Sequence, residues 1–122
     1  MNNTRLPPLF PPGQARPLVL DVTLRDGGYI NQWQFTNEQV DTAIRLAALA
    51  EVDLIEVGYV DDQPGLPEAA SCPPDMLRRA RSLCGRSKLA GMIRSTVANP
   101  AAVLSARAGL LDLLRIPLDM RS

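Results

Sequence analysis

Residues 18–29, LVLDVTLRDGGY, carry the strongest signal for the fold in this chain. The apolar start, residues 18–20, predicts a short buried strand. That strand ends on Arg25 and Asp26, and two glycines follow at once. A cation beside a carboxylate at a strand end suits a carbonyl-bearing substrate held next to a divalent metal ion. The glycines allow close approach of the backbone or a positive φ.

Beyond this stretch, apolar segments alternate with segments of helical period. Thr36 and Gln39 have the spacing of a helix capping box. The pair Asn99-Pro100 has the order of a helix start, and Gly109 that of a helix end. We expect strands at about 18–24, 54–58, 89–93 and 110–116, helices from Thr36 onward, at about 74–83 and from Asn99 to Gly109, and loops through Phe35 and at 61–73.

This order predicts an α/β protein in which helices cover apolar parallel strands. The spacing alone equally permits an open, doubly wound sheet. The sequence has no G-x-G-x-x-G or G-x-x-x-x-G-K motif that would indicate a nucleotide site.

Residues 24–35, LRDGGYINQWQF, resemble the first-strand signature of the pyruvate-carboxyltransferase-like, HMG-CoA-lyase-like metal-dependent aldolases. The resemblance is closest to the aldolase catalytic domain of 4-hydroxy-2-oxovalerate-aldolase-like proteins. It implies the N-terminal portion, about four strands, of a TIM (β/α)₈ barrel. The chain has 122 residues, whereas a full barrel needs roughly 250.

The resemblance also implies site residues. Arg25 would hydrogen-bond the carbonyl or enolate oxygen of a 2-oxo acid, and Asp26 would ligate Mn²⁺ or Mg²⁺. Gly27, Gly28 and Asn31 are expected to lie near the substrate. The alternative for Arg25 and Asp26 is an ion pair that caps a surface turn.

Tyr29 departs from the family pattern, because relatives place histidine or glutamine there. A phenol with a pKa near 10 is a poor base at neutral pH, so Tyr29 is expected to orient substrate, donate a proton or simply pack across the barrel mouth. Glu56 is the one charged residue in its apolar strand and needs a partner there. We expect it to point into the barrel and hold Arg25. Arg94 and Asp119 are expected to be solvated charges at the rim.

The chain contains no histidine, whereas metal-dependent members of the resembled family carry a His-x-His pair late in the barrel. We therefore expect this chain to be inactive without a C-terminal half. Three alternatives stay open: the N-terminal part of a longer enzyme, a half-barrel that pairs with itself or with a separate C-terminal half, and a truncated inactive product.

Composition excludes other classes of protein. Thirteen basic residues balance thirteen acidic ones, which argues against nucleic-acid or membrane-surface binding. No membrane-spanning segment or secretory signal is visible, so the cytoplasm is the expected compartment. Cys72 and Cys84 are expected to be reduced structural thiols. Residues 1–17 hold five prolines and are expected to form a disordered leader, with a PxxP spacing at 8–11; residues 18–122 would form the partial barrel domain.

Overall fold

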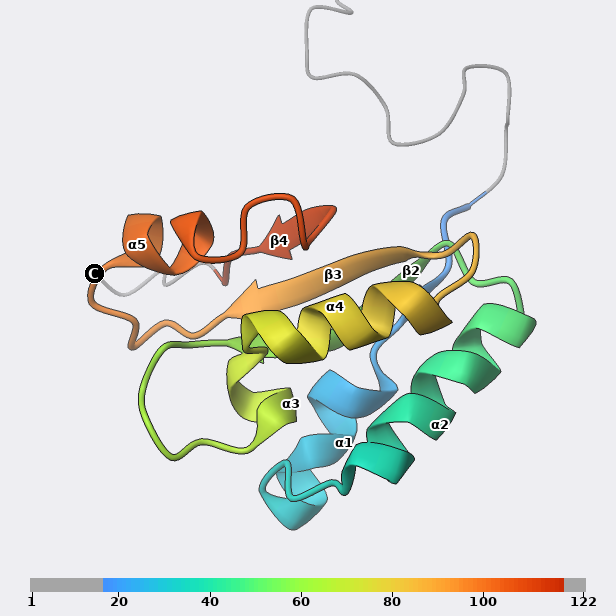
Figure 1. The fold of residues 1–122 in the computed structure, drawn as a ribbon, viewed down its shortest axis with the longest axis horizontal. Coiled ribbons are helices and arrows are strands. Elements are labelled where there is room, and N and C mark those ends of the chain that lie inside the picture. Colours follow the sequence, from blue (N-terminus) through green and yellow to red (C-terminus); the bar gives the residue numbers. More distant parts are fainter. Residues whose placement is uncertain (1–16, 118–122) are drawn as a thin grey trace, which may run out of the picture.

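The computed structural model describes residues 17–117, without the side chains of Tyr29 and Ile30. The predictions for the leader before Pro17, for Asp119 and for the side chain of Tyr29 lie outside these described residues. Four parallel strands form one open sheet in sequence order (Figure 1). The strands are β1 (Leu20–Asp21), β2 (Leu54–Val60), β3 (Lys88–Ile93) and β4 (Leu113–Arg115). The predicted α/β architecture is confirmed.

Helices alternate with these strands, and α2 and α4 lie side by side along the sheet (Figure 1). Their buried residues pack with Ile55 and Val57 of β2 into one apolar core. The predicted capping box is confirmed, since Gln39 N donates to Thr36 Oγ1 at 3.1 Å and Thr36 N to Gln39 Oε1 at 2.9 Å. The helices are α1 (Thr23–Asn31), α2 (Asn37–Leu49), α3 (Glu68–Ser71), α4 (Pro74–Leu83) and α5 (Pro100–Ser105).

The prediction of a strand to residue 24 and a loop through Phe35 was wrong, because α1 occupies most of that segment. Asp21 Oδ1 accepts from Thr23 N at 3.1 Å, where the chain turns from strand to helix. Leu24 is buried in the core, and this packing outweighs the low helix propensity of two glycines. The expected positive φ is not found at those glycines. Positive φ values are found instead just after the helix, at Gln32 (57°) and Trp33 (59°).

The expected loop at 61–73 contains the short helix α3. Buried Ala69 and Ala70 place α3 against β2. The contact is so close that a Cβ at Gly58 would overlap the carbonyl oxygen of Ala69. Other boundaries also differ: β2 runs on to Val60 rather than ending at residue 58, α5 ends at Ser105, before Gly109, and β4 begins at Leu113 rather than at residue 110.

Two carboxylates fix the amino-terminal ends of the strands. Asp53, just before β2, accepts from Val19 N at 2.7 Å through Oδ2. Asp112, just before β4, accepts from Leu89 N at 2.9 Å in the same way. Each bond joins one strand to the start of its parallel neighbour and so helps to set the register.

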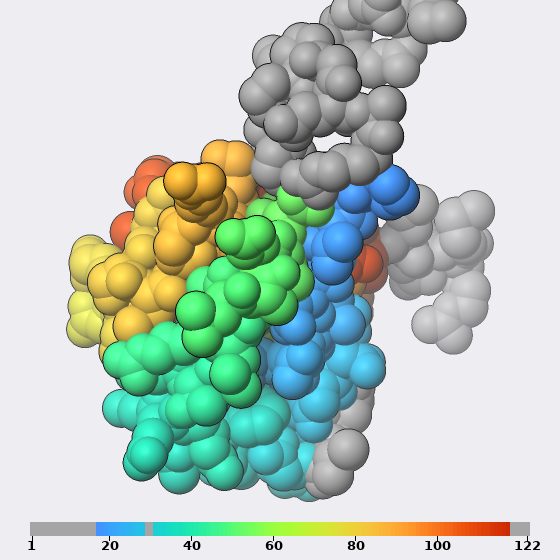
Figure 2. Space-filling model, turned by 90° about the vertical axis from the view of Figure 1, so that its right-hand side faces the viewer, coloured from blue at the N-terminus to red at the C-terminus, as the bar shows by residue number. Residues whose placement is uncertain are grey.

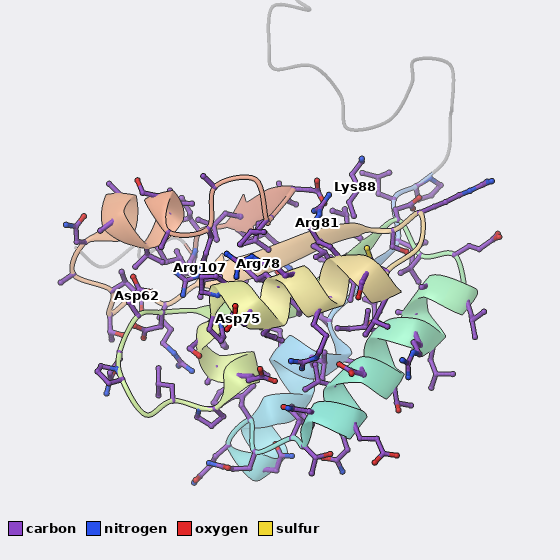
Figure 3. All side chains as sticks on the ribbon, in the orientation of Figure 1. Asp62, Asp75, Arg78, Arg81, Lys88 and Arg107 are labelled. Atoms are coloured by element: carbon purple, nitrogen blue, oxygen red, sulfur yellow. The ribbon has the colours of Figure 1, made fainter. Side chains whose placement is uncertain are left out.

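Arg107 forms a buried connection that the sequence did not predict. Its guanidinium donates to the carbonyl oxygens of Cys72 at 2.9 Å, Val103 at 2.9 Å, Ser71 at 3.0 Å and Asp61 at 3.2 Å. Nη1 also lies 2.8 Å from Oδ1 of Asp62 (Figure 3). Arg107 thus joins the end of α5 to both ends of the segment between β2 and α4.

Cys72 and Cys84 are buried free thiols, as expected. Burial raises the pKa of Cys72 to about 12. The thiol therefore stays protonated and unreactive at neutral pH.

The two glycines of α1 give a matched test of its packing. A Cβ at Gly27 would meet only Phe35, at 4.0 Å, whereas one at Gly28 would overlap the Trp33 ring. We expect Gly27→Ala to raise the free energy of unfolding by about 0.5–1 kcal/mol, as alanine does within a helix. We expect Gly28→Ala to lower it by about 1–3 kcal/mol, as overpacking does. Urea denaturation measures both, and equal effects would contradict the described helix.

Arg107→Ala should lower the free energy of unfolding by about 3 kcal/mol or more, because four carbonyl oxygens lose their buried donor. The control is Arg78→Ala, which removes the same charge from an exposed ion pair with Asp75 on α4 (Figure 3). That change should cost less than about 0.5 kcal/mol. Chemical denaturation of the two variants should therefore separate them clearly, and a small effect of Arg107→Ala would show that the connection is dispensable.

Candidate functional site

A fully buried carboxylate, Glu56, lies at the centre of the candidate site. Oε1 accepts from Nε of Arg25 at 2.7 Å, and Oε2 lies 3.1 Å from Nη1 of Arg115. Glu56 alternates along β2 with the core residues Ile55 and Val57, so it points to the opposite face of the sheet. The expected pairing of Glu56 with Arg25 is confirmed.

Arg115 is a partner that the sequence reasoning missed. It lies in β4 between Leu114 and Ile116. A signal for it was present, since it is a charged residue in a short apolar strand, as Glu56 is. Two arginines share one carboxylate, so these three side chains carry a net positive charge.

The guanidinium of Arg25 is held in its charged form. Partial burial lowers the pKa of Arg25, but the hydrogen bond and charge of Glu56 and a smaller contribution from Tyr59 outweigh it. The result is a pKa above the ordinary arginine value. Arg25 is thus a fixed cation with Nε committed to Glu56.

Asp26 lies beside Arg25, with Oδ1 3.6 Å from Nη1. Its side chain is 67% exposed, so the carboxylate is open to solvent and weakly paired. Within residues 17–117, no three Asp, Glu, Cys or His side chains come together in a way that could hold a metal ion. The side chains of this part of the chain therefore do not fit a resident divalent metal by themselves.

Trp33, Tyr59 and Arg94 form an aromatic and cationic cluster next to Arg25. Trp33 Nε1 donates to the carbonyl oxygen of Arg25 at 2.9 Å, and its ring meets that of Tyr59 edge-on at 5.5 Å. Cζ of Arg94 lies 4.5 Å from the Tyr59 ring centre and 5.0 Å from that of Trp33. Arg94 is therefore not the solvated rim charge that was expected.

The remaining predicted positions flank this cluster. Oδ1 of Asn31 accepts from Trp33 N at 3.1 Å, and its side chain is exposed. Gly28 is buried against the Trp33 ring. Gly27 is half-buried. Their predicted contact with substrate stays a prediction.

A hollow of about 380 Å³ opens beside the cluster, lined by Arg94, Trp33 and three glutamines, with Thr96, Leu66, Pro67 and Ala70 completing the wall. The glutamines are Gln32, Gln34 and Gln63. These residues follow α1, β2 and β3, so the hollow lies at the carboxyl ends of the strands, where open parallel sheets bind ligands.

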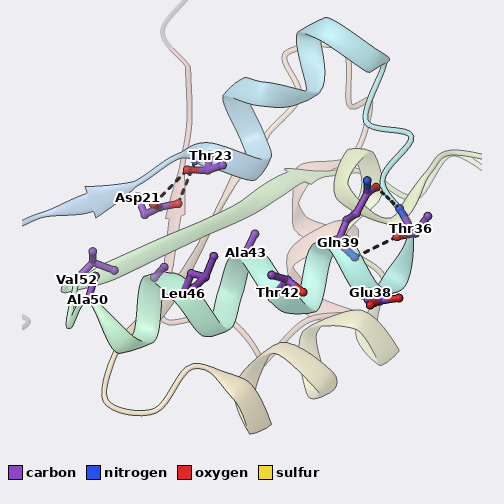
Figure 4. A pocket seen from close by; sticks show the side chains of 11 residues that line it. Asp21, Thr23, Thr36, Glu38, Gln39, Thr42, Ala43, Leu46, Ala50 and Val52 are labelled. Atoms are coloured by element: carbon purple, nitrogen blue, oxygen red, sulfur yellow. Dashed lines mark hydrogen bonds between the residues drawn. The ribbon is translucent and has the colours of Figure 1, made fainter.

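A larger groove of about 690 Å³ lies elsewhere, between β1 and α2 (Figure 4). Asp21 and Thr23 form one wall, and Ala43, Leu46 and Val52 contribute apolar surface to the other. The space-filling view shows the β1 run in blue beside the green end of α2 (Figure 2). This groove is lined by neither Arg25 nor Arg115. We therefore do not take it as the candidate active site, although it is larger than the hollow beside Arg94.

Among the described residues, no helix is both long and apolar enough to cross a bilayer. No protein-family model matches the chain.

Comparison with curated proteins finds relatives with related names. The chain is 31% identical to an oxaloacetate decarboxylase of Mycobacterium tuberculosis over 103 residues, and 30% identical to a 4-hydroxy-2-oxovalerate aldolase of Chloroflexus aggregans over 106 residues. Both matches cover 82% of this chain and 30% of the relative. The chain thus spans about a third of the length of these relatives.

One solved structure is similar in both fold and sequence. It is the N-terminal domain of a presumed aldolase from Bacteroides vulgatus, with a TM-score of 0.68 and 29% identity, over 84% of this chain and 36% of that one. The sequence relatives and the shared fold agree with the resemblance seen in residues 24–35. The relatives and the solved structure together support the aldolase family for this chain, which is similar to the N-terminal part of such a protein.

Proposed function

We propose that this chain forms the N-terminal part of an aldolase or lyase that acts on a 2-oxo acid through an enolate. The observation that carries the proposal is the fixed cation of Arg25, held 2.7 Å from buried Glu56 just after β1. A preorganised cation stabilises negative charge that develops during a reaction.

One enolate chemistry would serve both reactions that the names of the relatives indicate. Cleavage of the C3–C4 bond of a 4-hydroxy-2-oxo acid releases an aldehyde, and the 4-hydroxyl proton passes to a base. The electron pair of the broken bond moves into the C2–C3 bond and onto the 2-oxo oxygen, which gives an enolate. Loss of CO₂ from oxaloacetate leaves the same pyruvate enolate. The enolate oxygen is the charge that Arg25 would bind.

Each predicted residue then has a role in the proposal. Glu56 is fully buried, so we assign it the positioning of Arg25 rather than contact with substrate. Tyr29 stays a predicted proton donor or orienting group. Gly27, Gly28 and Asn31 stay predicted neighbours of the substrate.

The metal requirement belongs to the proposal as well. Asp26 offers one exposed carboxylate, and Mn²⁺ or Mg²⁺ needs several oxygen or nitrogen ligands. The described residues supply no such set around Asp26. A metal site would therefore need ligands from outside residues 17–117.

The groove between β1 and α2 supports a second candidate function, a half-barrel assembly module. Leu46 and Leu49 of α2 are 61% and 79% exposed, which leaves apolar surface near β1, an edge strand of the sheet that the described residues form. A second copy or a complementary C-terminal half would be the partner. Sedimentation of the purified chain distinguishes this candidate from a monomer.

Oxalate tests the role of Arg25, because it is a stable planar dianion that resembles pyruvate enolate. Trp33, the one tryptophan of the chain, lies against Arg25 and reports binding through its fluorescence. We expect Arg25→Gln to weaken oxalate binding about 10-fold or more, the worth of a charge-assisted hydrogen bond. Glu56→Gln should weaken it less, since Arg25 keeps its charge but loses its charged partner.

Arg45→Gln is the matched control, because Arg45 is an exposed arginine of α2. This variant should bind oxalate as the unmodified chain does. Equal affinity of the Arg25 and Arg45 variants for oxalate would remove the main support for the proposed function.

A further inference from the structure

Apart from Glu56, Arg25 and Arg115, the strongest feature without an assigned role is Arg94, at the wall of the 380 Å³ hollow. It follows β3 directly and is only 25% exposed. A guanidinium held in one place and facing a hollow is a typical binding group for carboxylates.

The position of the guanidinium is fixed by its neighbours. It stacks against Tyr59 and Trp33, with Cζ 4.5 and 5.0 Å from the ring centres. Nε also forms an ion pair with Oδ2 of Asp61 at 3.7 Å, a separation longer than a hydrogen bond. Stacking on ring faces leaves the edge of the guanidinium, with its N–H donors, available to a ligand.

The other polar residues of the hollow do not oppose an anion. They are the amides Gln32, Gln34 and Gln63 and the hydroxyl of Thr96, all of which can donate hydrogen bonds. Asp61 is the nearest carboxylate to Arg94, and its Oδ1 accepts from Gln63 N at 3.0 Å. Trp33 supplies an apolar wall for the carbon chain of a ligand.

Trp33 and Tyr59 connect Arg94 to Arg25. Trp33 donates to the carbonyl of Arg25 and packs against Arg94, and Tyr59 contributes to the pKa of Arg25 while its ring contacts Arg94. Trp33 and Tyr59 are therefore neighbours of both arginines, although Arg25 itself does not line the hollow.

We propose that Arg94 is a specificity-determining residue that binds a second carboxylate, so that the preferred substrates are 2-oxo dicarboxylic acids. This inference rests on the proposed function, since it assumes that Arg25 holds the 2-oxo end. An ion pair with Arg94 stabilises a carboxylate and opposes its loss as CO₂. The carboxylate at Arg94 is therefore one that the reaction retains, which favours carbon–carbon cleavage of the aldol type.

A matched pair of ligands tests the proposal on the whole chain. 2-Oxoglutarate and 2-oxopentanoate have the same five carbons and the same 2-oxo acid end, but only the first has a distal carboxylate. We expect Trp33 fluorescence to show at least 10-fold tighter binding of 2-oxoglutarate. Arg94→Gln should abolish this ratio and leave the affinity for 2-oxopentanoate unchanged, and Arg94→Lys should retain part of it.

Arg86→Gln is the control, because Arg86 is exposed and precedes β3 at the opposite end of the strand. It should keep the full ratio. A merely structural role of Arg94 would lower stability and weaken both ligands equally, which would overturn the proposal.

The remaining outcomes separate this inference from the proposed function. In one outcome, the unmodified chain binds both ligands equally well and Arg25→Gln binds neither. This outcome would overturn the role of Arg94 and support that of Arg25. In another outcome, the unmodified chain binds neither ligand, or Arg25→Gln binds them as tightly as the unmodified chain does. This outcome would overturn the roles of both Arg25 and Arg94.

Discussion

The constraint on which this structure depends is the burial of one carboxylate in the middle of β2. An ionised Glu56 without solvent requires charged partners, and the chain supplies Arg25 after β1 and Arg115 from β4. One side chain therefore connects both edges of the sheet. It also gives the sheet two chemically different faces, an apolar one under α2 and α4 and a charged one at the site. The same ion pairs that hold the strands together also hold the cation that would meet a substrate.

The sequence predicted the structure correctly where a feature depends on neighbouring residues, or where a buried side chain can be satisfied by one type of partner. The capping box of Thr36 and Gln39 and the limits of α4 at Pro74 and Leu83 follow from neighbouring residues alone. The pairing of Glu56 with Arg25 followed because a carboxylate in an apolar strand needs a cation. The likeness to aldolases, which the relatives support, could likewise be predicted from residues 24–35, since a run of specific residue types carries more information than periodicity does.

The sequence was a poor guide where distant packing overrides local preference. Two adjacent glycines argue against a helix, yet α1 runs through them because Leu24 is buried and Trp33 folds back over Gly28. Arg107 binds backbone carbonyls, and every residue has one, so no pattern marks its partners. Arg94 follows its strand as a rim charge would, and only the fold brings the rings of Trp33 and Tyr59 against it.

The position of Arg107 in the chain has a consequence for synthesis. Its carbonyl partners at Cys72 and Asp61 precede it by 35 and 46 residues. At roughly 5–20 residues per second, a ribosome makes 35 residues in about 2–7 s. During that interval the segment between β2 and α4 has emerged without its donor, and water must satisfy its carbonyl oxygens. This segment therefore stays accessible to chaperones and proteases until Arg107 arrives.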